Sequence, residues 1–216
     1  MHSFVNSLAA LRFENCFNPY YDRCLVHDRS DAPARRAAVL SAIVSRAVIS
    51  GVDAIWIGRD LGYRGGRRTG LALTDDVHTT RHARRWGVEV ERPTVGAVVA
   101  ERTAAVVWSM LDGINARIFL WNVFPLHPHE PGEPFTNRQH DARERRTGEN
   151  LLADLVTLLR PSRLIAIGND AAVSAARIAG QTPIVCVRHP SYGGQTQFVR
   201  QLKELYPEAG QEQRLL

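Results

Sequence analysis

Three polar residues lie at or just beyond the ends of apolar runs, where parallel strands place chemically active groups. Asp60 follows the run 55–57, Asn122 ends the run 117–122, and His189 follows the run 183–188. A carboxylate can orient water or stabilise a developing cation, and an amide offers a donor and an acceptor that can read a planar base. A histidine can donate a hydrogen bond to an oxygen that gains negative charge. These residue types suit hydrolysis of an N-glycosidic bond, in which the sugar becomes cation-like and the base leaves as an anion.

Other reaction classes have motifs that are missing from the sequence. No lysine follows the glycines of 58–70 as in a phosphate-binding P-loop, and neither G-x-G-x-x-G nor G-x-S-x-G occurs. The histidines of the stretch 127–129 and of the pair His78 and His82 form no H-E-x-x-H pattern, so we expect structural or surface roles for them. Three cysteines without C-x-x-C spacing argue against disulfides and against a four-cysteine zinc or iron–sulfur site. We therefore expect no metal and no cofactor.

The charge distribution is typical of a protein that contacts a polyanion. The chain carries 27 Lys and Arg against 22 Asp and Glu, a net charge of +5, and its pI is about 9.6. Arginines cluster in the stretches 59–68, 81–85 and 138–146. Clusters on loops can follow a phosphate backbone. Lys203 is the single lysine, which leaves few candidates for an amine nucleophile.

Apolar patterning predicts the elements that must position these groups. We expect helices over 34–50, 94–113, 144–160, 170–180 and 194–206, and strands over 52–58, 117–122, 163–168 and 183–188. Residues 1–33 should form an irregular or short-helical segment packed on the rest, and 123–140 a long loop. Continuously apolar strands that alternate with helices predict a three-layer α/β/α fold with a four-stranded parallel sheet, in one domain over 1–216.

In such sheets ligands bind outside the carboxyl ends of the strands. Those ends carry Arg59 and Asp60, then Asn122, then Asn169 and Asp170, then His189. The sequence therefore predicts a single site at this edge of the sheet.

Three motifs resemble those of the uracil-DNA glycosylase superfamily. "GRDLGYRGGRRTGLALT" (58–74) is similar to its first motif, typically Gly-Gln-Asp-Pro-Tyr followed by Gly-Leu-Ala-Phe. "FLWNVFP" (119–125) resembles the strand that carries the base-reading asparagine, and "VRHPSYGG" (187–194) resembles the final His-Pro-Ser motif. The motifs occur in the family's order and the resemblance spans about 50–200. It implies the same sheet and helix arrangement, and excision of uracil from DNA as the activity.

The resemblance also implies a role for each residue. Asp60 would position the attacking water, and His189 would hydrogen-bond the uracil O2 as charge builds there. Asn122 would read the N3 and O4 edge, Tyr63 would crowd C5 and exclude thymine, and Arg59 would contribute backbone groups to the base pocket. Leu73 replaces the phenylalanine that stacks on the base. The residues expected to contact DNA are Arg64, Arg67, Arg68, Ser191, Tyr192 and Gly193.

Several positions depart from the family pattern. Arg59 stands where the pattern has glutamine, and Gly62 is an extra residue before the tyrosine. Because Leu73 cannot stack as a ring would, Trp121 or Phe124 could supply the aromatic contact. The wedge leucine that follows His-Pro-Ser is missing, so the residue that penetrates the duplex is open. The pattern is that of a divergent branch without the iron–sulfur cluster of some relatives.

Two alternatives remain beside turnover on uracil-containing DNA. One is a non-turnover protein that holds uracil or abasic sites, as in a branch that traps its product through a histidine in a Lys-Arg-Arg-Ile-His loop. The stretch 138–146 has His140 before its arginines and does not match that motif. The other is an unrelated nucleoside or nucleotide hydrolase on a similar sheet.

With no signal peptide and no membrane-length apolar run, we expect a monomeric protein of the cytoplasm, nucleoid-associated if the source is bacterial.

Overall fold

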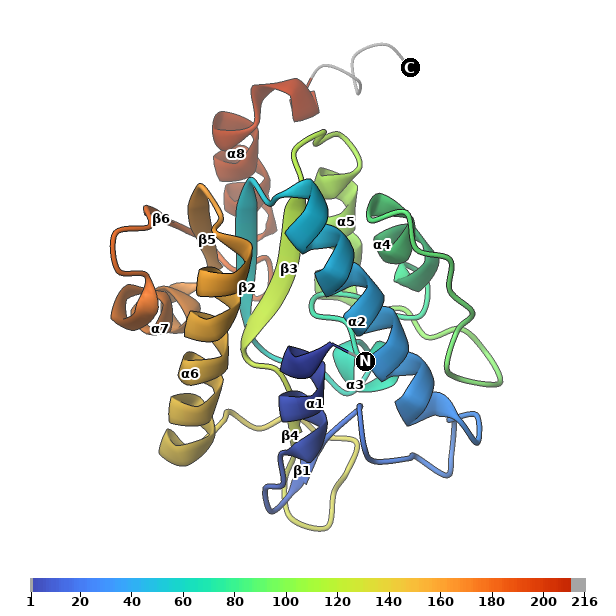
Figure 1. The fold of residues 1–216 in the computed structure, drawn as a ribbon. Coiled ribbons are helices and arrows are strands. Elements are labelled where there is room, and N and C mark those ends of the chain that lie inside the picture. Colours follow the sequence, from blue (N-terminus) through green and yellow to red (C-terminus); the bar gives the residue numbers. More distant parts are fainter. Residues whose placement is uncertain (1, 211–216) are drawn as a thin grey trace.

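The computed structural model describes residues 2–210, and its centre is a four-stranded parallel sheet (Figure 1). The spatial order is β3-β2-β5-β6, and every neighbouring pair runs parallel. Chain order and spatial order diverge at β2, since the chain leaves it for β3 on one side and returns on its other side as β5. Ligands bind at such a reversal of strand order in open α/β sheets. The strands are β2 (Ala54–Asp60), β3 (Ile118–Phe124), β5 (Arg163–Ile167) and β6 (Ile184–Val187).

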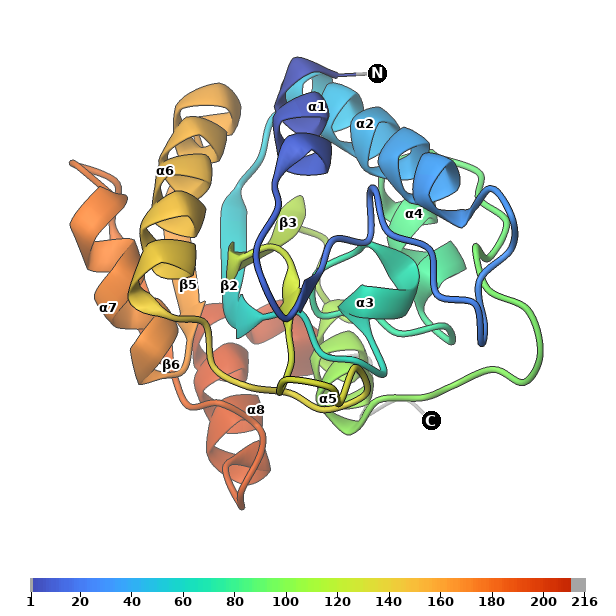
Figure 2. The same cartoon turned by 90° about the horizontal axis from the view of Figure 1, so that it is seen from below.

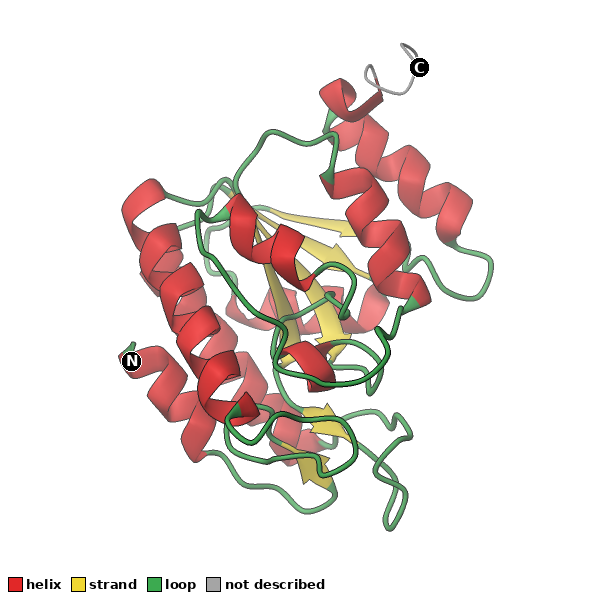
Figure 3. Ribbon diagram, turned by 90° about the vertical axis from the view of Figure 1, so that its right-hand side faces the viewer, coloured by secondary structure: helices red, strands yellow, loops and turns green. Residues whose placement is uncertain are grey.

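Helices cover both faces of this sheet, which confirms the expected three-layer α/β/α architecture (Figure 3). Alternate side chains of β2 and β3 enter two separate apolar clusters. One cluster is shared with α1 (Ser3–Ala10), α2 (Ala32–Ser50), α6 (Ala142–Leu159) and α7 (Asn169–Ile178). The other is shared with α5 (Arg102–Leu111) and α8 (Gln195–Leu205). Among the described residues, no helix is long and apolar enough to cross a membrane.

The helix α6 places its beginning at the carboxyl edge of the sheet. Asp141 caps it by accepting hydrogen bonds from the backbone amides of Arg143 and Glu144, and the Glu144 side chain bonds back to the Asp141 amide. Such a reciprocal box satisfies backbone donors that a first helical turn leaves unpaired. Arg138 bonds both carboxylate oxygens of Glu144 at 2.7 Å. The segment that precedes α6 is thereby fixed to the helix.

The predicted helix over 94–113 is wrong in its first half. The helix observed there, α5, begins only at Arg102. Gly96 adopts a positive φ of 76°, and Thr94 forms an isolated bridge with Asp28. Both features interrupt a helix, so residues 94–101 form an irregular connection.

The structure also contains short elements that patterning left out. They are α3 (Gly66–Thr69), α4 (Thr79–Arg85), the two-stranded ribbon of β1 (Cys16–Phe17) and β4 (His127–Pro128), and the 3-10 helix η1 (Pro207–Gly210). The ribbon joins the N-terminal segment to the loop expected over 123–140. Figure 2 looks at the carboxyl edge of the sheet from below, where the long segment before α6 crosses the strand ends and α3 lies beside them.

Buried polar contacts hold the N-terminal region against the loop that follows β2. Arg36 of α2 is almost fully buried, pairs with Asp28 and donates from Nε to the carbonyl of Arg68 at 2.8 Å. The Tyr20 hydroxyl donates to the carbonyl of Gly70, also at 2.8 Å. The loop that carries the first motif is therefore fixed by residues more than thirty positions earlier in the chain.

Gly148 allows α6 to lie directly on β3. A Cβ atom at this position would come within 2.1 Å of the Val123 carbonyl oxygen and 3.0 Å of the Phe124 Cα. Both atoms belong to the backbone of a central element and cannot move aside without shifting the strand. The close approach keeps the start of α6 and the end of β3 in a fixed relation.

We expect Gly148→Ala to destabilise the protein by about 2 kcal/mol or more, because overpacking forces backbone shifts. Helix propensity alone predicts the opposite sign, a gain of up to about 1 kcal/mol. Urea unfolding followed by circular dichroism measures the difference. Asn150→Ala, at an exposed position of the same helix, is the control and should stay within about 0.5 kcal/mol of wild type. An unchanged or raised stability of Gly148→Ala would contradict the close packing.

Candidate active site

Asp60 ends β2 at the carboxyl edge of the sheet, and an arginine and a histidine hold its carboxylate. Arg59 donates from Nε to Oδ2 at 2.8 Å, and Nδ1 of His140 contacts Oδ1. The Asp60 side chain is 8% exposed, and that of His140 is 5% exposed. The carboxylate is thus largely withdrawn from solvent and anchored at both oxygens.

Asn122 lies beside Asp60 on the neighbouring strand β3, where it pairs in register with Gly58. Its Nδ2 donates to the backbone carbonyl of Asp60 at 3.1 Å. The side chain is buried, and its Oδ1 has no hydrogen-bond partner among the described residues. A buried amide oxygen without a donor is costly and marks a place where a ligand group can bind.

Gly58 makes room for this amide. A Cβ atom on Gly58 would lie 2.7 Å from Nδ2 of Asn122 and 3.0 Å from Cδ2 of Leu73. Leu73 has a positive φ of 53°, and its carbonyl accepts from Nε1 of Trp108 at 3.1 Å. Gly58, Leu73 and Asn122 therefore meet on one face of β2, as the predicted base pocket requires.

His189 follows β6 and is held by Ser191. The Ser191 backbone amide lies 3.2 Å from Nδ1 of His189, and the Ser191 hydroxyl oxygen lies 2.7 Å from the same atom. A backbone amide can only donate, so Nδ1 is an acceptor and the ring hydrogen resides on Nε2. Burial lowers the pKa of His189, and the nearby guanidinium groups of Arg59 and Arg188 lower it further. The imidazole is thus a neutral Nε2–H donor.

Arg59 connects the strand ends. Besides its bond to Asp60 it donates from Nη1 to Oδ2 of Asp170, at the start of α7, at 3.0 Å. The backbone before α7 also approaches His189, since a Cβ on Gly168 would lie 3.3 Å from the Cβ of His189. Asp60, Asp170 and His189 are accordingly grouped around one guanidinium, as their positions at three strand ends predict.

The outer part of the site is formed by two loops. Arg64 is exposed and donates from Nε to the Tyr63 hydroxyl at 3.0 Å, while the Tyr63 amide bonds Oδ1 of Asn137. Tyr192 is 97% exposed, has a positive φ of 50° and precedes Gly193, which has a φ of 77°. Arg64, Tyr192 and Gly193 thus have the exposure that a contact with DNA requires.

Arg67 and Arg68 do not have that exposure, and the structure corrects their assignment as DNA contacts. The Arg67 guanidinium stacks over Phe17 at 3.8 Å from the ring centroid, and that of Arg68 pairs with Asp76 at 2.7 Å. Both arginines are more than nine-tenths buried. Their charges stabilise the loop from inside.

Ser191 and the two aromatic candidates also differ from expectation. The Ser191 hydroxyl is engaged with His189, so its first role is to hold the imidazole. Trp121 packs against Phe4 and Phe119 in the core, and Phe124 packs against Phe13 and His140. Both rings are at most 2% exposed. Neither can stack on a bound base, which leaves Leu73 as the apolar group beside Asn122.

His140 is the site residue that the sequence analysis did not assign to the centre. It lies 80 positions from Asp60, and no local pattern joins them. A signal was nevertheless present, because His140 directly precedes the Asp141-x-x-Glu144 box at the start of α6. A helix that precedes a parallel strand begins at the carboxyl edge, so His140 had to lie near the other strand ends.

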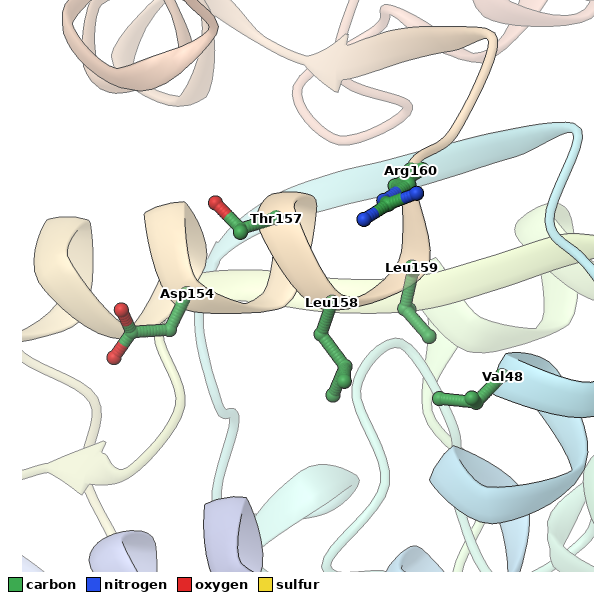
Figure 4. Close-up of a pocket in the computed structure, with 6 residues that line it drawn as sticks. All are labelled: Val48, Asp154, Thr157, Leu158, Leu159 and Arg160. Atoms are coloured by element: carbon green, nitrogen blue, oxygen red, sulfur yellow. The ribbon is translucent and has the colours of Figure 1, made fainter.

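A hollow of about 640 Å³ lies elsewhere, between the C-terminal turns of α2 and α6 (Figure 4). Val48, Asp154, Thr157, Leu158, Leu159 and Arg160 line it. The helix α6 begins beside the site and has 18 residues, so its far end is about 27 Å away. This hollow is therefore separate from the Asp60 edge.

The site has no arrangement suited to a metal ion. Within residues 2–210, no group of three or more His, Cys, Asp or Glu side chains is placed to bind one. What the edge does present is an anchored carboxylate, an amide with a free acceptor, and a neutral histidine donor. This set can bind a planar polar ring and stabilise opposite charges on its two sides.

Comparisons with known proteins identify the fold and the family of the chain. The solved structure of SMUG2 from Pedobacter heparinus has the same fold, with a TM-score of 0.60 and 13% sequence identity. The superposition covers 95% of this chain and 97% of that one. No curated protein sequence matches the chain significantly. The family model described as "Uracil DNA glycosylase superfamily" matches residues 52–208, well over half of the chain. The chain belongs to the uracil-DNA glycosylase superfamily.

Proposed function

We propose that this protein hydrolyses the N-glycosidic bond of uracil in DNA and leaves an abasic site. The observation that carries the proposal is the Asn122 carboxamide, whose buried Oδ1 lacks a donor beside the anchored carboxylate of Asp60. Membership in the superfamily supports glycosylase chemistry on DNA, and the site residues support uracil as the base.

Asn122 would read the base through its two remaining hydrogen-bonding groups. One Nδ2 hydrogen is used by the Asp60 carbonyl, which leaves the second for uracil O4, while Oδ1 accepts from N3–H. Cytosine has an amino donor at C4 and an acceptor at N3. Its amino group would therefore face the Nδ2 donor of Asn122, and its N3 would face the Oδ1 acceptor. A site built to pair with one pattern can reject the other by about 10⁴-fold. Leu73 would provide the apolar wall on which the ring rests.

His189 and Asp60 would act on opposite sides of the breaking bond. A neutral Nε2–H suits His189 for donating to uracil O2 as the base gains negative charge. The Asp60 carboxylate would face the sugar side, where positive charge develops, and would organise the attacking water. Both effects grow as charge separates, so they raise the rate more than the affinity.

DNA would be bound by the two exposed loops. Arg64 would contact phosphate, and the loop of Ser191, Tyr192 and Gly193 would approach the gap left when a base leaves the stack. Flipping a base out costs a few kcal/mol, and the fully exposed Tyr192 ring could fill the space with an aromatic face.

We propose that the protein acts as a monomer of one domain, in the cytoplasm and at the nucleoid if bacterial, without a cofactor.

The chemistry should be monofunctional. A strand-cleaving lyase needs an amine nucleophile that forms a Schiff base. Lys203, the single lysine, lies in α8, well beyond the His189 loop. The abasic product should therefore remain in an intact strand.

A second candidate function is a non-turnover protein that binds uracil or the abasic product. The observation in its favour is His140, because the structure brings the histidine of the arginine-rich stretch against Asp60. Such a protein would form a stoichiometric complex that survives denaturation. Multiple turnovers would exclude it.

Incubation with an oligonucleotide that contains one uracil tests the proposed function. We expect multiple turnovers, alkali-labile abasic product, no strand break without alkali, and full activity in EDTA. Asp60→Asn should slow single-turnover excision by about 10²-fold or more while DNA binding changes little. Borohydride trapping of a protein–DNA adduct would contradict the monofunctional assignment. Activity on free deoxyuridine but not on DNA would identify a nucleoside hydrolase instead.

Gly58→Ala tests whether Asn122 reads the base. The added methyl group would collide with Nδ2 of Asn122 and with Leu73, so we expect at least a tenfold loss of uracil excision. Affinity for undamaged DNA should remain, because the phosphate contacts lie on other loops. Thermal melting checks that the fold persists. Wild-type excision by the alanine variant would show that the Asn122 amide is not part of the pocket.

Tyr63→Ala tests the proposed wall against thymine. Uracil and thymine share the edge that Asn122 would read, so only a steric barrier at C5 separates them. We expect the variant to gain thymine excision while its uracil activity falls less than tenfold. Side-by-side assays on uracil and thymine opposite adenine measure the ratio. If the ratio stays as in wild type, another residue forms the wall.

A further inference from the structure

His140 contacts the carboxylate of Asp60. Its Nδ1 lies against Oδ1 of Asp60, and Arg59 occupies the other carboxylate oxygen. An ionised carboxylate can only accept hydrogen bonds, so Nδ1 of His140 carries the hydrogen. In the neutral imidazole Nε2 then has a free lone pair, and no described residue bonds that atom.

The surroundings fix the orientation of this ring. Phe124 of β3 makes an edge contact, with 6.2 Å between the ring centroids and an interplanar angle of 63°. On the other side His140 is followed by Asp141, whose carboxylate is committed to the first amides of α6. A ring that is held by Asp60, Phe124 and the start of a helix cannot turn its Nε2 elsewhere without breaking these contacts.

The two histidines of the site therefore have opposite hydrogen-bonding roles at each ring nitrogen. His189 accepts at Nδ1 and presents an Nε2–H donor, whereas His140 donates at Nδ1 and presents an Nε2 acceptor. In active sites, two titratable groups whose environments favour opposite roles, one as proton donor and one as proton acceptor, are typical of an acid–base pair. A carboxylate that orients a histidine through Nδ1 is the arrangement by which imidazole becomes a general base.

We propose that His140 takes the proton of the attacking water and that Asp60 acts through it as a positioning residue. This inference rests on the proposed glycosylase function and deepens it. As the bond between C1′ and N1 breaks, its electron pair goes to the uracil, whose O2 accepts a hydrogen bond from His189. The water oxygen bonds to the cationic C1′, and one water proton passes to Nε2 of His140. Release of that proton to solvent or to the leaving base restores the neutral imidazole.

Several charged and titratable groups lie around His140. Asp60 lies against it and carries Arg59 on its other oxygen. On the side of α6 are Asp141 and the ion pair of Arg138 with Glu144. Cys16 of β1 also faces this region, and burial, with Glu144 next, raises the pKa of its thiol, so the thiol stays uncharged. The Cys16 thiol therefore contributes no titration in the neutral pH range.

Single-turnover excision from pH 5.5 to 8.5 tests the assignment with His140→Ala and His140→Gln. We expect the wild-type rate to decline toward acid pH, and we expect both variants to lose that decline and about 10²-fold in rate at neutral pH. Added imidazole should restore part of the rate to His140→Ala but not to His140→Gln, whose side chain fills the space. Binding of an oligonucleotide with a non-hydrolysable uracil nucleotide should remain within threefold. His129→Ala, in the same segment, is the matched control.

Three results would overturn the inference. One is a wild-type rate and pH profile in the His140 variants. Another is a loss of rate without any change in pH profile and without imidazole rescue, which would mean that His140 only supports the fold. The third is a denaturation-stable adduct formed by wild type and absent from His140→Ala, which would make His140 a nucleophile. If wild type excises no uracil at all, the proposed function itself fails, and the inference fails with it.

Discussion

Gly58 has no side chain, and this allows the Asn122 amide of the neighbouring strand to lie across β2 and bond the Asp60 carbonyl. Parallel pairing sets the register that places Gly58 opposite Asn122. The missing Cβ of Gly58 also leaves room for the side chain of Leu73, whose backbone has a positive φ. The absence of one methyl group thereby brings the Asn122 amide, the Leu73 side chain and the Asp60 backbone together. The rest of the fold keeps these two strands and their loops in that relation.

Arginine performs two different tasks in this protein. Arg36, Arg67 and Arg68 are buried and stabilise the first-motif loop through Asp28, Asp76 and an aromatic ring. Arg59 and Arg64 remain partly or fully exposed at the site. A buried ion pair adds little net stability but is costly to break, so such pairs fix geometry more than they strengthen the fold. The loop that follows Asp60 is accordingly a fixed part of the scaffold.

The sequence predicted those features that depend on local pattern. Four apolar runs and the helices between them specify the parallel sheet. Asp60 ends its strand and His189 follows its strand as predicted, whereas β3 continues past Asn122 to Phe124. Contacts between distant segments could not be predicted in the same way. Arg67 and Arg68 stand in a glycine-rich stretch typical of an exposed loop, and only Phe17 and Asp76 show that they are buried. The prediction of a helix before Arg102 was wrong, because the positive φ of Gly96 and the bridge between Thr94 and Asp28 interrupt a helix there.

The proposed reading of the base by Asn122 can be measured apart from catalysis. Oligonucleotides with 2′-fluorinated deoxyuridine or deoxycytidine resist hydrolysis, and fluorescence anisotropy gives their affinities for wild type and for Asn122→Ala. We expect wild type to prefer the uracil nucleotide by tenfold or more and the variant to bind both equally. A preference that survives in Asn122→Ala would contradict base reading by Asn122.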